Sequence, residues 1–240
     1  MPVPEPSPAY VLHARKYGEV HLILDVFTHE AGRLPLMARG AASSRSVRRG
    51  LLQPFIPLLI AWSGKGSIAN LRQVEARGTS VNLLGTALFS GFYINELTQR
   101  LLGEHEPVPE LFVAYEQCLR LLAQTDGSEI DTALRQYELS LLRVLGYGVD
   151  LETEANTGKP VSVHEVYSYQ IEYGLRHASD GDSLRIGGAT LLALAKGEGM
   201  DRRQRQEARQ LMRHVIGYYL GGRPLRSREL FQSQHNQENH

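Results

Sequence analysis

The sequence predicts an α+β protein in which a five-stranded β-barrel comes first and a mainly helical domain with a small β-hairpin follows. Residues 9–75 contain five short segments that are rich in β-branched and aromatic residues and are separated by turns. From residue 79 onward, apolar residues return every three or four positions, as in amphipathic helices. We therefore expect a barrel domain over residues 1–78, a helical domain over 79–233 and a disordered tail over 234–240.

The five expected strands cover residues 9–15, 19–28, 33–39, 51–62 and 67–75. The fourth strand is interrupted by Pro54 and Pro57, and Gly64-Lys65-Gly66 is expected as the hairpin turn that follows it. Five strands in about 70 residues, with no helix between them, are typical of the oligonucleotide-binding (OB) barrel. The sequence therefore predicts an OB barrel at the N-terminus.

Helical periodicity predicts three helices over residues 79–102, 108–124 and 128–145, which we expect to form one bundle. A strand over 161–173 is expected to hairpin through Gly181 to residues 184–186. Helices are expected over 190–196 and 201–220, the second with Asp201 as a candidate N-cap.

A basic segment, RLPLMARGAASSRSVRRG at residues 33–50, lies between two expected strands and contains no acidic residue. Arginine guanidinium groups donate forked hydrogen bonds to phosphates, and glycine and serine allow close approach of the backbone. The segment therefore predicts a loop that binds a nucleic-acid backbone. The alternative is a solvated loop that happens to be basic. The candidate DNA contacts here are Arg33, Arg39, Arg45, Arg48, Arg49 and, in the adjacent turn, Lys65.

Charge is distributed unevenly, although 26 basic and 26 acidic residues cancel. Residues 1–80 hold ten basic and five acidic side chains, residues 81–195 hold seven and sixteen, and residues 196–228 hold nine and three. Two basic regions around an acidic middle indicate a polyanionic partner. The second basic region adds the candidate contacts Arg202, Arg205, Arg209 and Arg213 on one helical stripe, then Arg223, Arg226 and Arg228. The alternative is that the stripe is the solvated face of an amphipathic helix.

Several classes of function find no support in the sequence. Cys118 is the only cysteine, so an intrachain disulfide and a thiolate zinc site are excluded. No H-E-x-x-H or G-x-S-x-G motif is present, and no residue is a candidate for catalysis. We therefore expect a protein that is not an enzyme and has no cofactor and no metal. The N-terminus has no signal-peptide pattern and no apolar run is long enough to span a membrane, so a cytoplasmic protein is expected.

The chain resembles the RecO family of bacterial recombinational repair proteins along almost its whole length. The segments that carry the resemblance are VLHARKYGE at 11–19, LDVFT at 24–28, GR at 32–33, ARGA at 38–41, LQPFIPL at 52–58, GFYINEL at 91–97, RQYELSLL at 135–142, LGYGV at 145–149 and YLGGRPLRSRELF at 219–231. The resemblance implies an OB barrel joined to a helical domain. It also implies binding of single- and double-stranded DNA, annealing of complementary strands, and, with the partner RecR, loading of RecA onto DNA coated by single-stranded DNA-binding protein.

The sequence departs from some members of that family in one segment. Those members hold zinc through two cysteine pairs after the LGYG motif, whereas LETEANTGKP at 151–160 contains no cysteine. We expect polar turn contacts to stabilise this segment instead. The alternative to a DNA-binding function is an adaptor that bridges repair proteins without touching DNA, with the arginines serving solubility.

The resemblance also implies a contact with the acidic, apolar C-terminal tail of single-stranded DNA-binding protein. We expect this contact on the third helix, at Arg135, Leu139 and Leu142, because Arg135 lies one turn before Leu139 on the same face. Leucine side chains would hold the apolar end of the tail, and a guanidinium would bind its carboxylate. The alternative is that Arg135 pairs with an acidic neighbour such as Asp131, four residues earlier, and that Leu139 belongs to the core.

Overall fold

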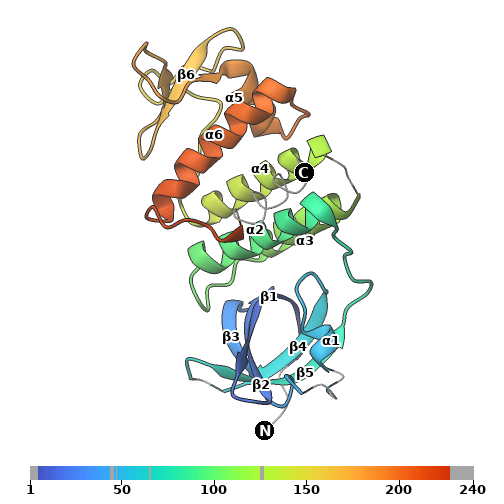
Figure 1. Cartoon of the computed structure of the whole chain (residues 1–240). Helices are drawn as coiled ribbons and strands as arrows, with labels where there is room; N and C mark the ends of the chain where they lie inside the picture. The colour runs from blue at the N-terminus through green and yellow to red at the C-terminus, as the bar shows by residue number, and fades with distance from the viewer. Residues whose placement is uncertain (1–4, 44–45, 47, 65, 125–126, 228–240) are drawn as a thin grey trace. The chain divides into compact units, whose positions relative to one another are not determined.

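The computed structural model describes residues 5–43, 46, 48–64, 66–124 and 127–227 (Figure 1). The expected tail at 234–240 lies outside the described residues. The chain divides into two compact units, residues 1–123 and 124–240.

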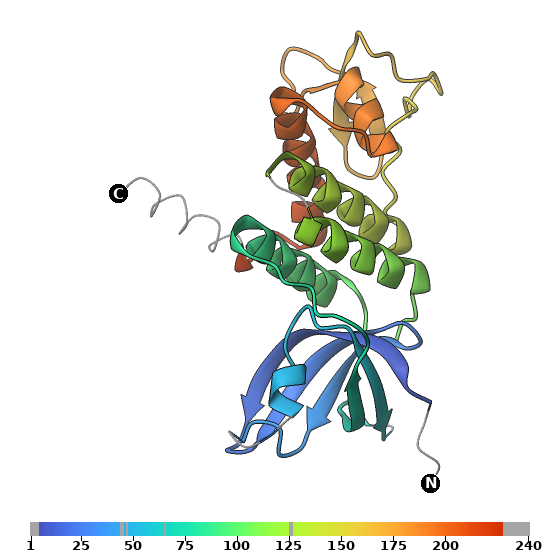
Figure 2. The same ribbon diagram turned by 90° about the vertical axis from the view of Figure 1, so that its right-hand side faces the viewer.

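The first unit contains a closed five-stranded barrel, which confirms the predicted OB-type fold (Figure 2). Its strands are β1 (Ser7–Tyr17), β2 (His21–Thr28), β3 (Gly32–Ala38), β4 (Leu58–Ser63) and β5 (Ala69–Ala76), in the spatial order β1-β2-β3-β5-β4. Parallel pairing of β3 with β5, through Leu36 and Ala69, closes the barrel, and the other strand pairs are antiparallel. Alternate residues, such as Leu34 and Leu36 on β3, point inward and are fully buried.

The prediction for residues 51–62 is wrong in its first half. A short helix, α1 (Arg48–Leu51), is followed by turns, and β4 begins only at Leu58. Pro54 and Pro57 provide no backbone N–H for a strand ladder. Phe55, between them, has a positive φ of 67°, which is incompatible with a continuous strand.

Two helices, α2 (Gly85–Leu101) and α3 (Pro109–Gln124), belong with the barrel in the first unit. Helix α2 contacts β1 through Asn95, whose Nδ2 donates to Leu12 O at 3.0 Å, and α3 packs on β1 and β2 through an aromatic cluster. Phe112 and Tyr115 of α3 lie with their ring centroids 5.1–5.9 Å from those of Tyr10 and Phe27. The compact units therefore do not coincide with the predicted division at residue 78. That division stays a prediction, as does the three-helix bundle, which would extend into the second unit.

The second unit contains α4 (Gly127–Val144), β6 (Val166–Gln170), β7 (Gly174–His177), β8 (Ile186–Gly187), α5 (Gly188–Lys196) and α6 (Arg202–Tyr219). The small sheet has the order β7-β6-β8. The predicted hairpin is therefore partly wrong: β6 turns at residues 171–173 into β7, and β8 pairs on the other edge of β6. Helix α6 begins with a capping box between Asp201 and Gln204, which confirms the predicted N-cap.

The segment at 151–160 is held by polar contacts. The backbone N–H groups of Glu154 and Ala155 donate to the carbonyls of Lys159 and Leu175 at 2.9 and 2.8 Å. The buried Glu154 carboxylate accepts from Thr157 Oγ1 at 2.9 Å and lies 3.0 Å from His177 Nε2. Within the described part of the chain, no group of three or more His, Cys, Asp or Glu side chains could hold a metal ion. No helix among these residues is long and apolar enough to cross a membrane.

Candidate nucleic-acid interface

Three segments of the barrel meet at one of its ends, and together they form the candidate interface. They are the described residues of three ranges: 15–23 around the β1–β2 loop, 36–50 at and after the end of β3, and 63–72 around the β4–β5 loop. The first two are joined by hydrogen bonds from Ala42 N to Val20 O and from Gly40 N to His21 Nδ1, both 3.0 Å long. The second and third are joined by the β3–β5 pairing and by Arg39 Nε, which donates to Asn70 Oδ1 at 3.1 Å. We call this surface the basic barrel end.

The basic barrel end carries a strong excess of positive charge. Its three segments contain a single acidic residue, Glu19. The basic residues that the structure describes there are Arg15, Lys16, Arg39, Arg48, Arg49 and Arg72, and the sequence adds Arg45 and Lys65 within the same ranges. Such a concentration of one sign of charge attracts a phosphate backbone.

The described cations of this surface are exposed and available. Arg45 and Lys65 lie outside the described residues, and the other six are exposed. Arg39 and Arg72 each use one N–H to orient the side chain, Arg72 Nε donating to Ser63 Oγ at 2.6 Å. Among the described residues none of the six forms an ion pair, so their guanidinium and ammonium groups can still bind phosphates.

Sequence analysis missed Arg15, Lys16 and Arg72, because each lies on a strand rather than in the basic segment. A signal was present: the end of β1 and the start of β5 had to meet the basic segment once the strands were paired as an OB barrel. OB folds bind oligonucleotides on the face formed by their second and third strands and through the β1–β2 and β4–β5 loops. Both of these loops belong to the basic barrel end.

Arg33 does not belong to this surface, although it lies in the basic segment. It stands at the start of β3, near the opposite end of the barrel, and its side chain is only 14% exposed. Its Nη1 donates to Asp25 Oδ2 at 3.0 Å and its Nε to Leu102 O at 2.9 Å. Burial raises the pKa of Asp25, although the bonds from Gln99 and Arg33 act in the other direction. We therefore leave Arg33 out of the proposed DNA contacts.

The arginine stripe on α6 is divided between two roles. Arg209 Nη2 lies 2.9 and 2.8 Å from the two carboxylate oxygens of Asp131 on α4, and Arg205 Nε lies 3.9 Å from the same carboxylate. These two arginines hold α4 and α6 together. Arg202 and Arg213 are exposed and have no ion-pair partner among the described residues.

The last candidate DNA contacts follow α6. Arg223 and Arg226 are exposed, and Arg228 lies outside the described residues. The role of this segment stays a prediction.

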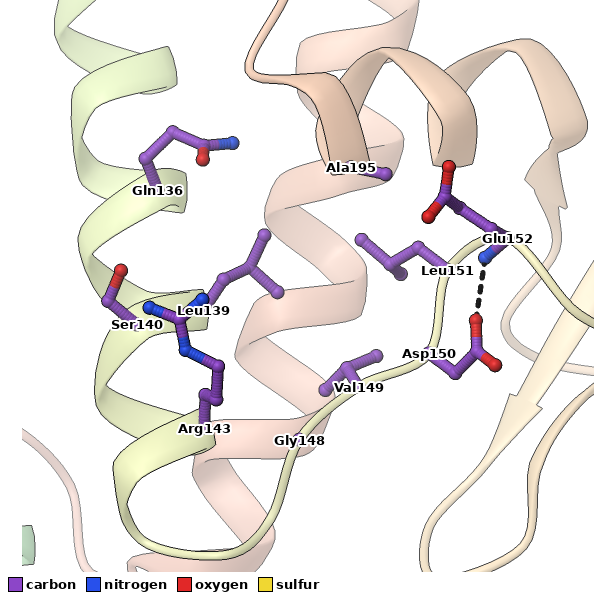
Figure 3. A pocket seen from close by; sticks show the side chains of 10 residues that line it. All are labelled: Gln136, Leu139, Ser140, Arg143, Gly148, Val149, Asp150, Leu151, Glu152 and Ala195. Carbon is purple, nitrogen blue, oxygen red and sulfur yellow. Dashed lines mark hydrogen bonds between the residues drawn. The ribbon is translucent and has the colours of Figure 1, made fainter.

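The three residues expected to bind the protein tail are not brought together. Arg135 is buried and donates from Nη2 to Glu138 Oε1 at 2.5 Å, which confirms the alternative that it pairs with an acidic neighbour, although this neighbour is Glu138 and not Asp131. Leu142 is fully buried. Leu139 is partly exposed and lines a cavity of about 440 Å³ between α4, the segment at 148–152 and α5 (Figure 3).

The cavity combines apolar and charged groups. Leu139, Val149, Leu151 and Ala195 supply its apolar lining, while Arg143, one turn after Leu139, is exposed and lies beside it (Figure 3). The arginine that lines this cavity is therefore Arg143 and not Arg135, and the acidic residues Asp150 and Glu152 line it as well.

Comparison with known proteins gives one consistent result. Two family models match, described as Recombination protein O N terminal over residues 4–79 and Recombination protein O C terminal over residues 85–229. A protein of Methylococcus capsulatus named DNA repair protein RecO is 47% identical over 225 residues, covering 94% of this chain and 92% of its own. Proteins of the same name from Vibrio parahaemolyticus and Actinobacillus succinogenes are 45% and 43% identical, each over 92% of this chain and over 90% and 93% of their own.

Proposed function

The chain belongs to the RecO family, and from this premise we propose that it is a DNA repair and recombination mediator. In this role it binds single- and double-stranded DNA and anneals complementary strands. With RecR it helps to load RecA onto DNA coated by single-stranded DNA-binding protein. The names of the relatives and the family's recombination domains support the repair role. The partners RecR and RecA rest on the family resemblance alone.

One observation carries the DNA-binding part of the proposal. Among the described residues, the basic barrel end has six basic residues and one acidic residue, and these six cations are exposed and without ion-pair partners. Each cation that contacts a phosphate releases a counterion, which makes binding favourable at low salt. The location on an OB barrel supports a nucleic acid over other polyanions.

Annealing needs no catalytic residue under this proposal. Two complementary strands repel each other through their phosphates, and a basic surface that screens this repulsion lets the bases pair. Because the contacts are electrostatic, each strand stays free to shift its register. We therefore propose that the protein acts by binding DNA rather than by catalysis. This role would place it with the DNA in the cell.

Binding measured against salt separates this function from the adaptor alternative. We expect single- and double-stranded oligonucleotides to bind the full chain, with log affinity falling linearly as log salt concentration rises. Strand annealing, with and without single-stranded DNA-binding protein, then tests the mediator role. An adaptor would show no salt-dependent DNA binding and would not accelerate annealing.

A second proposed contact rests on the cavity beside α4. We propose that the C-terminal tail of single-stranded DNA-binding protein inserts its apolar end against Leu139, Val149 and Leu151 and places its carboxylate near Arg143. The cavity's apolar lining and the exposed guanidinium one turn from Leu139 support this arrangement.

A tail peptide provides the test of this second contact. Arg143→Ala should weaken peptide binding about ten- to a hundredfold, because a hydrogen bond between charged groups contributes about 1.5–3 kcal/mol. Arg213→Ala is the matched control, since Arg213 is equally exposed in the same unit but does not line the cavity. Equal peptide affinity for wild type and Arg143→Ala would place the tail elsewhere.

A further inference from the structure

An exposed aromatic side chain stands within the basic barrel end. Tyr17 is the last residue of β1, and 53% of its surface is exposed. It pairs across the strands with His21, whose Nδ1 accepts the hydrogen bond from Gly40 N. The backbone of Tyr17 is therefore held next to the Arg39–Gly40 turn. The exposed Lys16 precedes Tyr17 on β1.

Nothing in the described structure gives Tyr17 a stabilising role. Tyr10 and Tyr115 are buried, contact other rings and donate hydrogen bonds from their hydroxyls to Glu116 and Asn95. The side chain of Tyr17 has no ring contact, hydrogen bond or ion pair with any described residue. An aromatic ring exposed to water does not gain the free energy of burial. The exposed ring of Tyr17, which lies among cations, is therefore a candidate to stack against a ligand.

We infer that Tyr17 stacks on an unpaired base of a strand whose phosphates lie on the arginines of the basic barrel end. The inference rests on the proposed DNA-binding function and adds to it a preference for unpaired bases. Aromatic rings within a basic groove bind single strands in this way, because every base has a π-face. In a duplex the base faces are covered by their neighbours, so the ring would find no partner there.

The surroundings of Tyr17 favour this ligand over an apolar protein surface. Val20, 43% exposed, is the apolar residue beside it in the β1–β2 loop, and the neighbouring basic segment contains no acidic residue. Glu19 lies in the same loop and opposes phosphate there. We therefore expect the sugar–phosphate backbone of the bound DNA strand to lie on the side of Arg39 and α1.

The test compares three ligands of equal length on the full chain: a thymidine strand, an abasic strand and a duplex. Tyr17→Leu should weaken binding of the thymidine strand about 5- to 100-fold and leave the abasic strand and the duplex within about twofold. Tyr17→Phe keeps the ring and should bind all three like wild type. Melting temperatures of both variants, expected to match wild type at this exposed strand end, control for folding.

The possible outcomes distinguish stacking of Tyr17 on a base from binding through the charges of the phosphates alone. An unchanged affinity of Tyr17→Leu for the thymidine strand overturns the inference, and so does an equal loss on all three ligands. If wild type binds the abasic strand and the duplex but Tyr17→Phe no longer binds the thymidine strand, the hydroxyl and not the ring is the contact, and stacking is overturned. Failure of wild type to bind any of the three ligands would instead overturn the proposed DNA-binding function itself.

Discussion

The two ends of the barrel carry arginines from the same segment of sequence, yet they have opposite characters. At the basic barrel end, Arg39, Arg48 and Arg49 are exposed and have no ion-pair partner among the described residues. At the other end, Arg33 is enclosed by Asp25, the carbonyl of Leu102 and Glu104, and its own carbonyl accepts from His105 N at 2.8 Å. We call this second region the clamped end. An arginine's role here depends on what the rest of the chain places around it.

Replacing one glycine at each end of the barrel by alanine tests this difference, and one of the two replacements should give the largest expected change in the free energy of unfolding. Gly32 at the clamped end and Gly40 at the basic barrel end have similar positive φ values, +66° and +70°. A Cβ at Gly32 would overlap the carbonyl of Glu106, whereas a Cβ at Gly40 would meet nothing within 4 Å. Gly32→Ala should therefore lower the free energy of unfolding by about 3 kcal/mol or more. Gly40→Ala should lower it by only about 1–2 kcal/mol, the cost of the left-handed conformation.

Urea denaturation of the two alanine variants checks this prediction. The difference between them isolates the steric overlap with Glu106, since both carry the same backbone penalty. Equal losses would mean that the segment at 103–106 can move away from β3 without cost.

The second prediction concerns DNA binding. The triple variant Arg39→Ala, Arg48→Ala, Arg49→Ala should weaken binding and flatten the slope of log affinity against log salt by about 0.7–0.9 for each phosphate that is no longer bound. Its melting temperature should stay close to that of wild type, because the three side chains are exposed. Adding Arg45→Ala should flatten the slope further. An unchanged slope would move the DNA site to Arg202, Arg213 or Arg223.

The third prediction contrasts the paired and unpaired arginines of α6. Asp131→Ala removes the shared partner of Arg205 and Arg209 and should lower the free energy of unfolding by about 0.5–1 kcal/mol, since the Arg209 pair is partly exposed. Arg213→Ala, on the same helix, should change stability by less than about 0.5 kcal/mol. Thermal melts of both variants measure this. A larger loss in Arg213→Ala would show that the stripe is structural throughout.

The smallest expected effect is that of a metal chelator. The segment at 151–160 is held by Glu154, Thr157 and His177 rather than by cysteines, so a chelator should leave the melting temperature unchanged. Elemental analysis should find no stoichiometric zinc. One zinc per chain would point to a histidine and carboxylate site.

The sequence by itself determined the architecture of the barrel and the limits of most helices. Alternating buried residues on β3 can bury one face only as a strand, and the Asp201 cap marks the start of α6 through local backbone contacts. These features depend on residues close together in the chain. The wrong part, residues 51–57, is where prolines and a positive φ at Phe55 override an apolar pattern that resembles a strand.

Only the tertiary structure decided what each arginine can do. Arg209 meets Asp131 78 residues away, and Arg33 meets the carbonyl of Leu102 69 residues away. Arg15 and Arg72 join the basic barrel end only because the strands close in one particular order. The sequence alone does not distinguish an arginine that can bind a ligand from one that is already paired. Whether its guanidinium can bind a ligand depends on burial and on the opposite charges that distant segments bring to it, and these exist only once the chain has folded.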